Sequence, residues 1–195
     1  ILAGLSRRKF PVAYLSIEDE LAIVAARILV HSLSAPAEVI DRLKSLRTRG
    51  EDVSFLRASW REHISHLPIH LRYAAGWSVE RTCQGIFDAA RRGARVVAVD
   101  YLQAFKGTDN GSRKDFLETS LGALKGAAGK ANVHLIVGSQ LRRWEGVEKV
   151  RPTRMLCKGS SAIEESAEYV VLAWRPGKDK EYADGQEPAM VIVDK

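Results

Sequence analysis

A short apolar run from Val96 to Val99 constrains the fold of this 195-residue chain more than any other feature. Three of its four residues are β-branched valines, and such a continuous run is typical of a strand that is covered on both faces. The run ends at Asp100, where an acidic side chain follows the apolar strand directly. Because strands covered on both faces belong mainly to parallel sheets flanked by helices, the run predicts an α/β fold.

Further apolar runs alternate with amphipathic helical patterns and support this prediction. The pattern over residues 21–29 has helical spacing, and Asp19 is predicted to cap that helix. Ser78 is predicted to cap a second helix, and a third covers residues 117–131. The predicted strands are 11–17, 69–73, 96–100 and 133–137, with a closing hairpin formed by 170–174 and 189–193. We therefore expect a mostly parallel, twisted sheet with helices on both faces and a C-terminal hairpin.

Composition and length indicate one globular domain over residues 1–195. Hydrophobic residues make up 46% of the chain, which is enough for a full α/β core. No apolar run reaches the roughly 20 residues that span a bilayer, and no secretory signal is evident, so we expect a cytoplasmic protein without a membrane segment. Cys83 and Cys157 lie far apart and lack CxxC spacing, which argues against a zinc site.

Three predicted strands end in side chains that suit phosphate chemistry. Glu18, Asp100 and Gln140 each follow a strand, and the carboxyl ends of parallel strands meet at one edge of the sheet. A magnesium–phosphate site needs a carboxylate for the metal, a group that polarises the attacking water, and a neutral group that senses the γ-phosphate. A polar residue ends many buried strands without any such role, but three together favour the functional interpretation.

The chain carries a net charge of +6, and its basic residues gather after two of these strands. Such clusters fit a polyanionic partner, although a solvated basic surface is the alternative. The first cluster is Lys106, Arg113 and Lys114, and the second is Arg142, Arg143, Lys149, Arg151, Arg154 and Lys158.

Five segments in order give the chain a family resemblance from about Pro11 to Lys195. Together they resemble the C-terminal, RecA-like motor domain of the DnaB-type replicative helicases, with its P-loop NTPase core. The segments are Leu15 to Glu18, Leu67 to Ile69, Val99 to Gln103 (similar to the Walker B segment), Ser139 to Leu141, and residues 159–168.

The resemblance implies roles for individual residues. Glu18 resembles the base that activates water, Asp100 the Walker B magnesium ligand, and Gln140 the residue that couples nucleotide state to the DNA loops. Loops 106–114 and 142–158 match regions that face the central channel, and they contain both basic clusters. Lys195 matches the lysine of a finger that reaches the neighbouring subunit's nucleotide. ATP and Mg²⁺ are the implied cofactors, and the implied partners are single-stranded DNA, a homo-hexameric ring, primase and a helicase loader.

One departure from the family pattern is the absence of a GxxxxGK[ST] phosphate loop. The family places this loop just before the helix that Ile1 to Arg8 resemble, on a central strand. We therefore expect a chain truncated at both ends, with a gap in its sheet. We also expect residues 1–195 alone to lack ATP hydrolysis.

Three functions remain open at this point. The first is an ATP-driven DNA helicase that translocates on single-stranded DNA during replication. The second is a RecA-fold DNA-binding ATPase without unwinding activity, such as a recombinase-like protein or a plasmid or phage replication accessory protein. The third is a nucleotide-silent scaffold or loader, which the missing phosphate loop would explain.

Overall fold

The computed structural model describes residues 2–33, 54–106, 112–141, 151–157, 163, 165–174 and 189–195. These residues divide into two compact units. The first contains residues 1–106 and 123–138, and the second contains 107–122 and 139–195. The helices are α1 (Leu2–Arg7), α2 (Leu21–Leu33), α4 (Ser54–His63), α5 (Val79–Arg91) and α6 (Arg113–Ala131), with short 3₁₀ turns η1 (Leu102–Ala104) and η3 (Arg154–Leu156).

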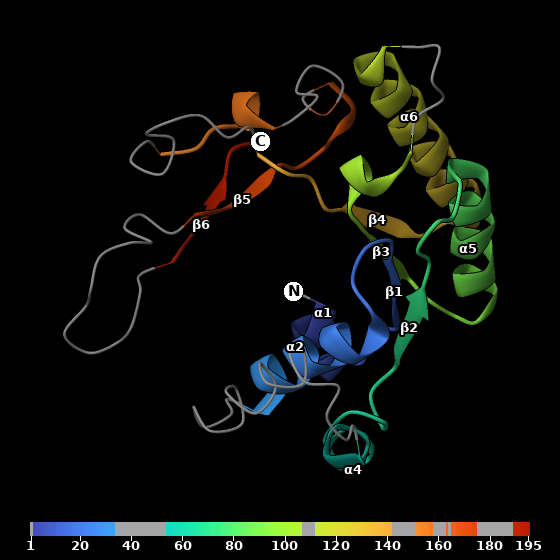
Figure 1. The fold of residues 1–195 in the computed structure, drawn as a ribbon, viewed down its shortest axis with the longest axis vertical. Coiled ribbons are helices and arrows are strands. Elements are labelled where there is room, and N and C mark those ends of the chain that lie inside the picture. The colour runs from blue at the N-terminus through green and yellow to red at the C-terminus, as the bar shows by residue number, and fades with distance from the viewer. Residues whose placement is uncertain are drawn as a thin grey trace. The chain divides into compact units, whose positions relative to one another are not determined.

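A four-stranded parallel sheet forms the centre of the first unit. Its strands are β1 (Val12–Ser16), β2 (Ile69–Tyr73), β3 (Val96–Asp100) and β4 (His134–Val137), in the spatial order β2-β1-β3-β4. All three strand pairings are parallel. Figure 1 shows α5 and α6 on one side of this sheet and α1 and α2 on the other. The predicted α/β fold with a parallel sheet and helices on both faces is confirmed. The expected gap between strands is wrong for the described strands, because β2, β1, β3 and β4 are hydrogen-bonded to one another without interruption.

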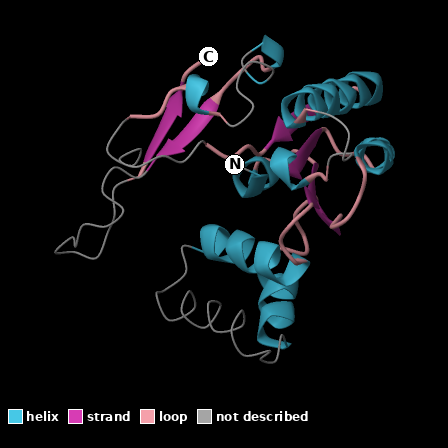
Figure 2. Cartoon of the chain, turned by 45° about the horizontal axis from the view of Figure 1, so that its top comes forward, coloured by secondary structure: helices cyan, strands magenta, loops and turns pink. Residues whose placement is uncertain are grey.

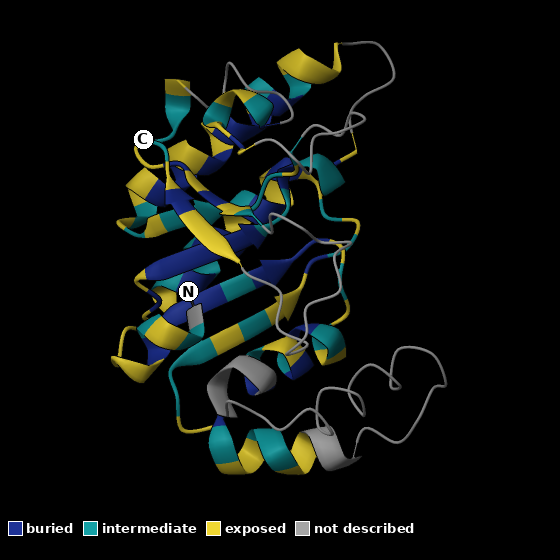
Figure 3. Cartoon of the chain, turned by 90° about the vertical axis from the view of Figure 1, so that its left-hand side faces the viewer, coloured by how far each residue is buried: buried dark blue, intermediate teal, exposed yellow. Residues whose placement is uncertain are grey.

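The two central strands supply the core. Val12, Leu15, Val97 and Val99 are all at most 2% exposed, whereas the apolar residues of β4 are only half-buried. Figure 3 shows this concentration of buried residues in the middle of the sheet. The continuous run from Val96 to Val99 is therefore buried on both faces, as its sequence predicts.

Helix α5 starts where the sequence predicts, and α2 starts differently. The Ser78 hydroxyl oxygen accepts a hydrogen bond from the Arg81 amide at 3.2 Å, which makes Ser78 the N-cap of α5. The prediction that Asp19 caps α2 is wrong. The helix begins at Leu21, and the Asp19 carboxylate pairs with the Arg27 guanidinium two turns along the helix. Asp19 therefore forms an ion pair with Arg27 instead of capping the helix backbone.

The second unit contains the C-terminal strands. Strands β5 (Val171–Trp174) and β6 (Met190–Val193) pair antiparallel, which confirms the predicted hairpin pairing, and Figure 2 shows them as a separate pair of arrows. The Asp194 carboxylate accepts a hydrogen bond from the Arg154 amide at 2.7 Å and so ties η3 to the end of β6.

None of the described helices is both long enough and apolar enough to cross a bilayer.

Candidate functional site

The ends of β1 and β3 bring two of the predicted site residues to one edge of the sheet. Ser16 lies opposite Asp100 in the parallel register, and the Ile17 amide donates to the Asp100 carbonyl oxygen at 2.9 Å. Glu18 follows directly and is exposed, whereas Asp100 is half-buried. The structure therefore places Glu18 and Asp100 at the same carboxyl edge, where ligands of open α/β sheets bind.

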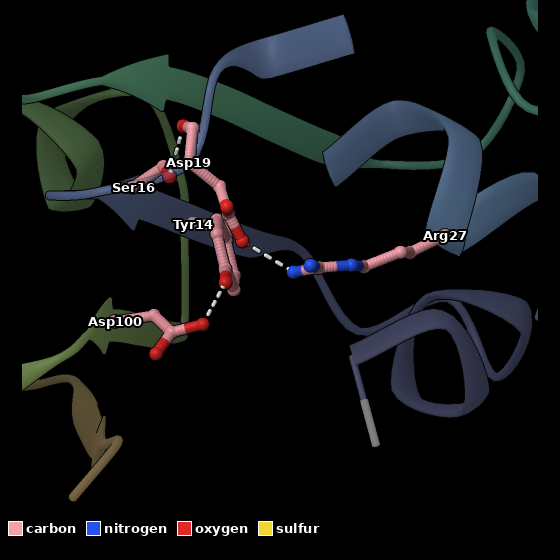
Figure 4. Close-up of polar contacts among 5 residues, drawn as sticks. All are labelled: Tyr14, Ser16, Asp19, Arg27 and Asp100. Atoms are coloured by element: carbon pink, nitrogen blue, oxygen red, sulfur yellow. Dashed lines mark hydrogen bonds and ion pairs between the residues drawn. The ribbon is translucent and has the colours of Figure 1, made fainter. Parts of the chain in front are cut away.

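The Asp100 carboxylate has a partner within the sheet. The Tyr14 hydroxyl donates a hydrogen bond to Asp100 Oδ2, as Figure 4 shows. Burial of the phenol, the hydrogen bond to Asp100 and the negative charge of Asp100 all raise the pKa of Tyr14 well above its ordinary value. Tyr14 is therefore a protonated donor at neutral pH.

Gly138 leaves the space in which the same carboxylate lies. A Cβ atom at this position would lie 2.7 Å from Asp100 Oδ1 and 3.2 Å from the Tyr101 Cβ. The Gly138 amide donates to the Val99 carbonyl oxygen at 2.9 Å, and its own carbonyl oxygen accepts from the Leu102 amide at the same distance. These backbone hydrogen bonds hold Gly138 beside Asp100. The carboxylate fits there because glycine has no side chain.

Two contacts hold the turn that carries Glu18. The Ser16 hydroxyl, which is buried, donates to the backbone carbonyl oxygen of Asp19. The Asp19 carboxylate pairs with Arg27 on α2, so the turn is tied to the strand before it and to the helix after it (Figure 4). The backbone of the turn that carries Glu18 is therefore anchored at two points.

The donor set at this edge suits Mg²⁺ bound together with phosphate. Mg²⁺ prefers oxygen ligands, keeps several waters, and is commonly held by one or two carboxylates plus substrate phosphates. The half-buried Asp100 carboxylate, at the carboxyl edge of the sheet, could supply one such oxygen ligand. No cluster of three or more His, Cys, Asp or Glu side chains occurs among the described residues, so the described side chains form no dedicated metal cage.

The remaining predicted site residues come from other segments of the chain. Gln140 is exposed, three residues beyond β4, and belongs to the second unit. Lys195 is the exposed last residue, and its carbonyl oxygen accepts from the Val170 amide at 3.2 Å. Lys106, Arg113, Lys114 and Arg151 are all exposed.

Local contacts involve two of these basic residues. Lys114 pairs with Glu118 at 3.6 Å, and the Arg113 guanidinium carbon lies 5.2 Å from the centre of the Phe116 ring. Arg142, Arg143, Lys149 and Lys158 fall outside the described part of the chain, as do residues 159–162 and 164.

Tyr14 and Gly138 are site residues that the sequence patterns do not predict. In the sequence, Tyr14 is indistinguishable from the other residues of an apolar strand, and Gly138 resembles an ordinary loop residue. Their signal is positional, because Tyr14 lies two residues before the end of β1 and Gly138 follows β4 directly.

Comparison with solved structures supports the fold. One similar structure is a DnaB-like replicative helicase, described with its interactions with primase, which has a TM-score of 0.73 and 24% identity. The alignment covers 98% of this chain but only 49% of that one, so the chain spans about half the length of this relative. Another is described as an ATPase domain, with the same TM-score and identity, and 72% of that chain is covered.

Comparison of the sequence with protein-family models identifies the family to which the chain belongs. No curated protein matches the sequence. The family model for the DnaB-like helicase C terminal domain matches residues 2–195, nearly the whole chain. The chain therefore belongs to the family of DnaB-like helicase C-terminal domains, whose RecA-like fold it shares.

Proposed function

We propose that this chain is the motor part of an ATP-dependent DNA helicase that translocates on single-stranded DNA in replication. The observation that carries the proposal is the meeting of Glu18 and Asp100 at the carboxyl edge of a parallel sheet, in a member of the DnaB-like family. An exposed carboxylate and a half-buried one at the same edge of the sheet are the groups that water activation and metal binding require.

Within this proposal, each residue at the edge has a separate task. Glu18 takes the proton of the attacking water, and the two contacts of its turn hold the backbone from which it extends. Asp100 would hold Mg²⁺ through its carboxylate, and that ion would supply positive charge to the phosphate oxygens of ATP. Gln140 senses the γ-phosphate from the segment after β4. Lys195 contributes positive charge to a neighbouring subunit's nucleotide.

The exposed basic residues extend the proposal to DNA. Lys106, Arg113, Lys114 and Arg151 are exposed, as phosphate-binding side chains must be. Together with Arg142, Arg143 and Lys149, they would track the backbone of a single strand.

Partners form a further part of the proposal. A homo-hexameric ring would let Lys195 act across a subunit boundary. Primase is a proposed partner because a similar helicase is described with primase. A helicase loader is a proposed partner on the family resemblance alone. Sedimentation that finds only monomers in the presence of ATP and Mg²⁺ would remove the ring from this proposal.

Substitution of Glu18 tests the assignment of the base. In the full-length protein, which would include a phosphate loop, we expect Glu18→Gln to bind ATP normally but to lose hydrolysis by about two to four orders of magnitude, because an amide cannot accept the proton from water. Steady-state phosphate release and equilibrium nucleotide binding measure the two effects. Glu20→Gln is the matched control, since Glu20 is an exposed carboxylate on the same segment. Wild-type turnover in Glu18→Gln would show that Glu18 is not the base.

Unwinding separates the proposed helicase from the other functions. A forked DNA duplex should be opened only with ATP, Mg²⁺ and intact Glu18. DNA-stimulated hydrolysis without strand separation would instead indicate a DNA-binding ATPase that does not unwind. Absence of nucleotide binding would indicate a scaffold or loader.

A further inference from the structure

Tyr14 and Asp100 share one face of the sheet although 86 residues separate them in sequence. Alternate residues of a strand point to the same face, and the register pairs Tyr14 with Ala98 and Ser16 with Asp100. The residue opposite Tyr14 is thus a small alanine, and Asp100 is the next residue of β3 on that face. This arrangement lets the phenol ring reach diagonally to the carboxylate.

The contact limits how the carboxylate can turn. Oδ2 accepts the Tyr14 hydroxyl, and Oδ1 lies against Gly138. Rotation of the carboxylate about its terminal bond would break a charge-assisted hydrogen bond, which is stronger than one between neutral groups. Each carboxylate oxygen still has lone pairs for a second partner. The hydrogen bond therefore orients Asp100 without using up its capacity to bind a cation or a cation-bound water.

We propose that Tyr14 is a positioning residue that holds the Asp100 carboxylate in the orientation in which it binds Mg²⁺ with a nucleotide. The inference rests on the proposed function, in which Asp100 is the magnesium ligand. Hydrogen-bond partners of this kind commonly fix the orientation of metal ligands, and their loss weakens metal binding.

The test is a binding measurement that does not depend on turnover. A fluorescent ATP analogue is held at fixed concentration with the full-length protein, and its anisotropy is followed as Mg²⁺ is added. We expect Tyr14→Phe to raise the half-saturating Mg²⁺ concentration roughly tenfold, because loss of an outer partner of a metal ligand typically weakens binding by at least this factor. Tyr73→Phe is the matched control, since Tyr73 is an exposed tyrosine at the end of the neighbouring strand β2, and its Mg²⁺ dependence should equal the wild type.

Asp100→Asn distinguishes failure of this inference from failure of the proposed function. If Asp100→Asn weakens the Mg²⁺ dependence and Tyr14→Phe does not, the positioning role is wrong and the magnesium assignment stands. If neither variant changes it, the magnesium assignment of Asp100 is wrong, and the role of Tyr14 is overturned with it.

A spectroscopic readout needs no Tyr14 variant. Binding of Mg²⁺ to Asp100 should change the hydrogen bond of the phenol, and so give an ultraviolet difference spectrum in the tyrosine band when Mg²⁺ is added to the protein with ADP. We expect this signal in the wild type and in Tyr73→Phe, and its loss in Asp100→Asn. A wild-type protein that binds Mg²⁺ and ADP without this signal would overturn the inference.

Discussion

At the scale of single residues, the site depends on how little space surrounds the Asp100 carboxylate. We expect Gly138→Ala to destabilise the protein by about 1–3 kcal/mol, because the new methyl group would lie 2.7 Å from Asp100 Oδ1 and the side chain or backbone must shift. The displaced carboxylate should also raise the Mg²⁺ concentration needed for nucleotide binding. Urea denaturation measures the first effect and anisotropy of a fluorescent nucleotide the second.

Gly126→Ala is the control for that substitution. Gly126 lies in α6, with nothing within 4 Å of the position that a Cβ would take. Alanine should therefore stabilise the helix slightly, by about 0.5–1 kcal/mol, because it reduces the backbone entropy lost on folding. Equal changes in the free energy of unfolding for Gly138→Ala and Gly126→Ala would show that the space beside Asp100 does not affect stability.

At the scale of elements, helix α5 sets the path of the chain into β3. Its N-cap, Ser78, holds the first turn, and the helix ends at Arg91, shortly before β3 begins at Val96. Gly85 lets the helix lie close to the Trp77 ring, since a Cβ there would lie 2.8 Å from Trp77 Cζ3. Local capping and close packing thus fix the element that delivers Asp100 to the edge of the sheet.

The cap predicts a measurable loss of stability. Ser78→Ala should lower the free energy of unfolding by about 1 kcal/mol, since the Arg81 amide loses its acceptor. Ser78→Asp keeps an acceptor at the N-terminus of the helix and should retain wild-type stability. Thermal or urea unfolding followed by circular dichroism compares the three proteins, and an unchanged Ser78→Ala would show that water replaces the cap at no cost.

At the scale of the whole molecule, the placement of charge matters more than its total. The net charge is +6, and neutralising Arg142, Arg143 and Lys149 with glutamine gives +6 − 3 = +3. If these residues contact DNA phosphates, each lost contact should reduce the slope of log affinity against log salt by about 0.7 for a single strand. Fluorescence anisotropy with labelled single-stranded DNA at several salt concentrations measures the slope.

A control with the same charge change separates position from net charge. Lys9, Arg92 and Arg95 are exposed and precede β1 or β3 in sequence, at the amino ends of those strands. Glutamine at these three positions also gives +3 and should leave the salt slope unchanged. Equal slopes for both triple variants would assign the basic residues after β4 to the solvated surface.

The strands, the helices and the edge where Glu18 and Asp100 lie could be predicted from local sequence patterns. Valine-rich runs, helical spacing and Ser78 are local signals, and parallel strands bring their carboxyl ends to one edge. The prediction for Asp19 was wrong, because a carboxylate before a helix can either cap the backbone or pair with a cationic side chain. The local sequence pattern does not distinguish these two possibilities.

The hydrogen bond from Tyr14 to Asp100, and the space that Gly138 provides for the carboxylate, are seen only once the chain has folded. Both facts depend on the register of neighbouring strands, and a shift of one residue would turn Tyr14 to the opposite face of the sheet. That register is set by packing and by hydrogen bonds between segments far apart in the chain, such as those from Gly138 to Val99 and from Ile17 to Asp100. No local pattern in the sequence contains this information.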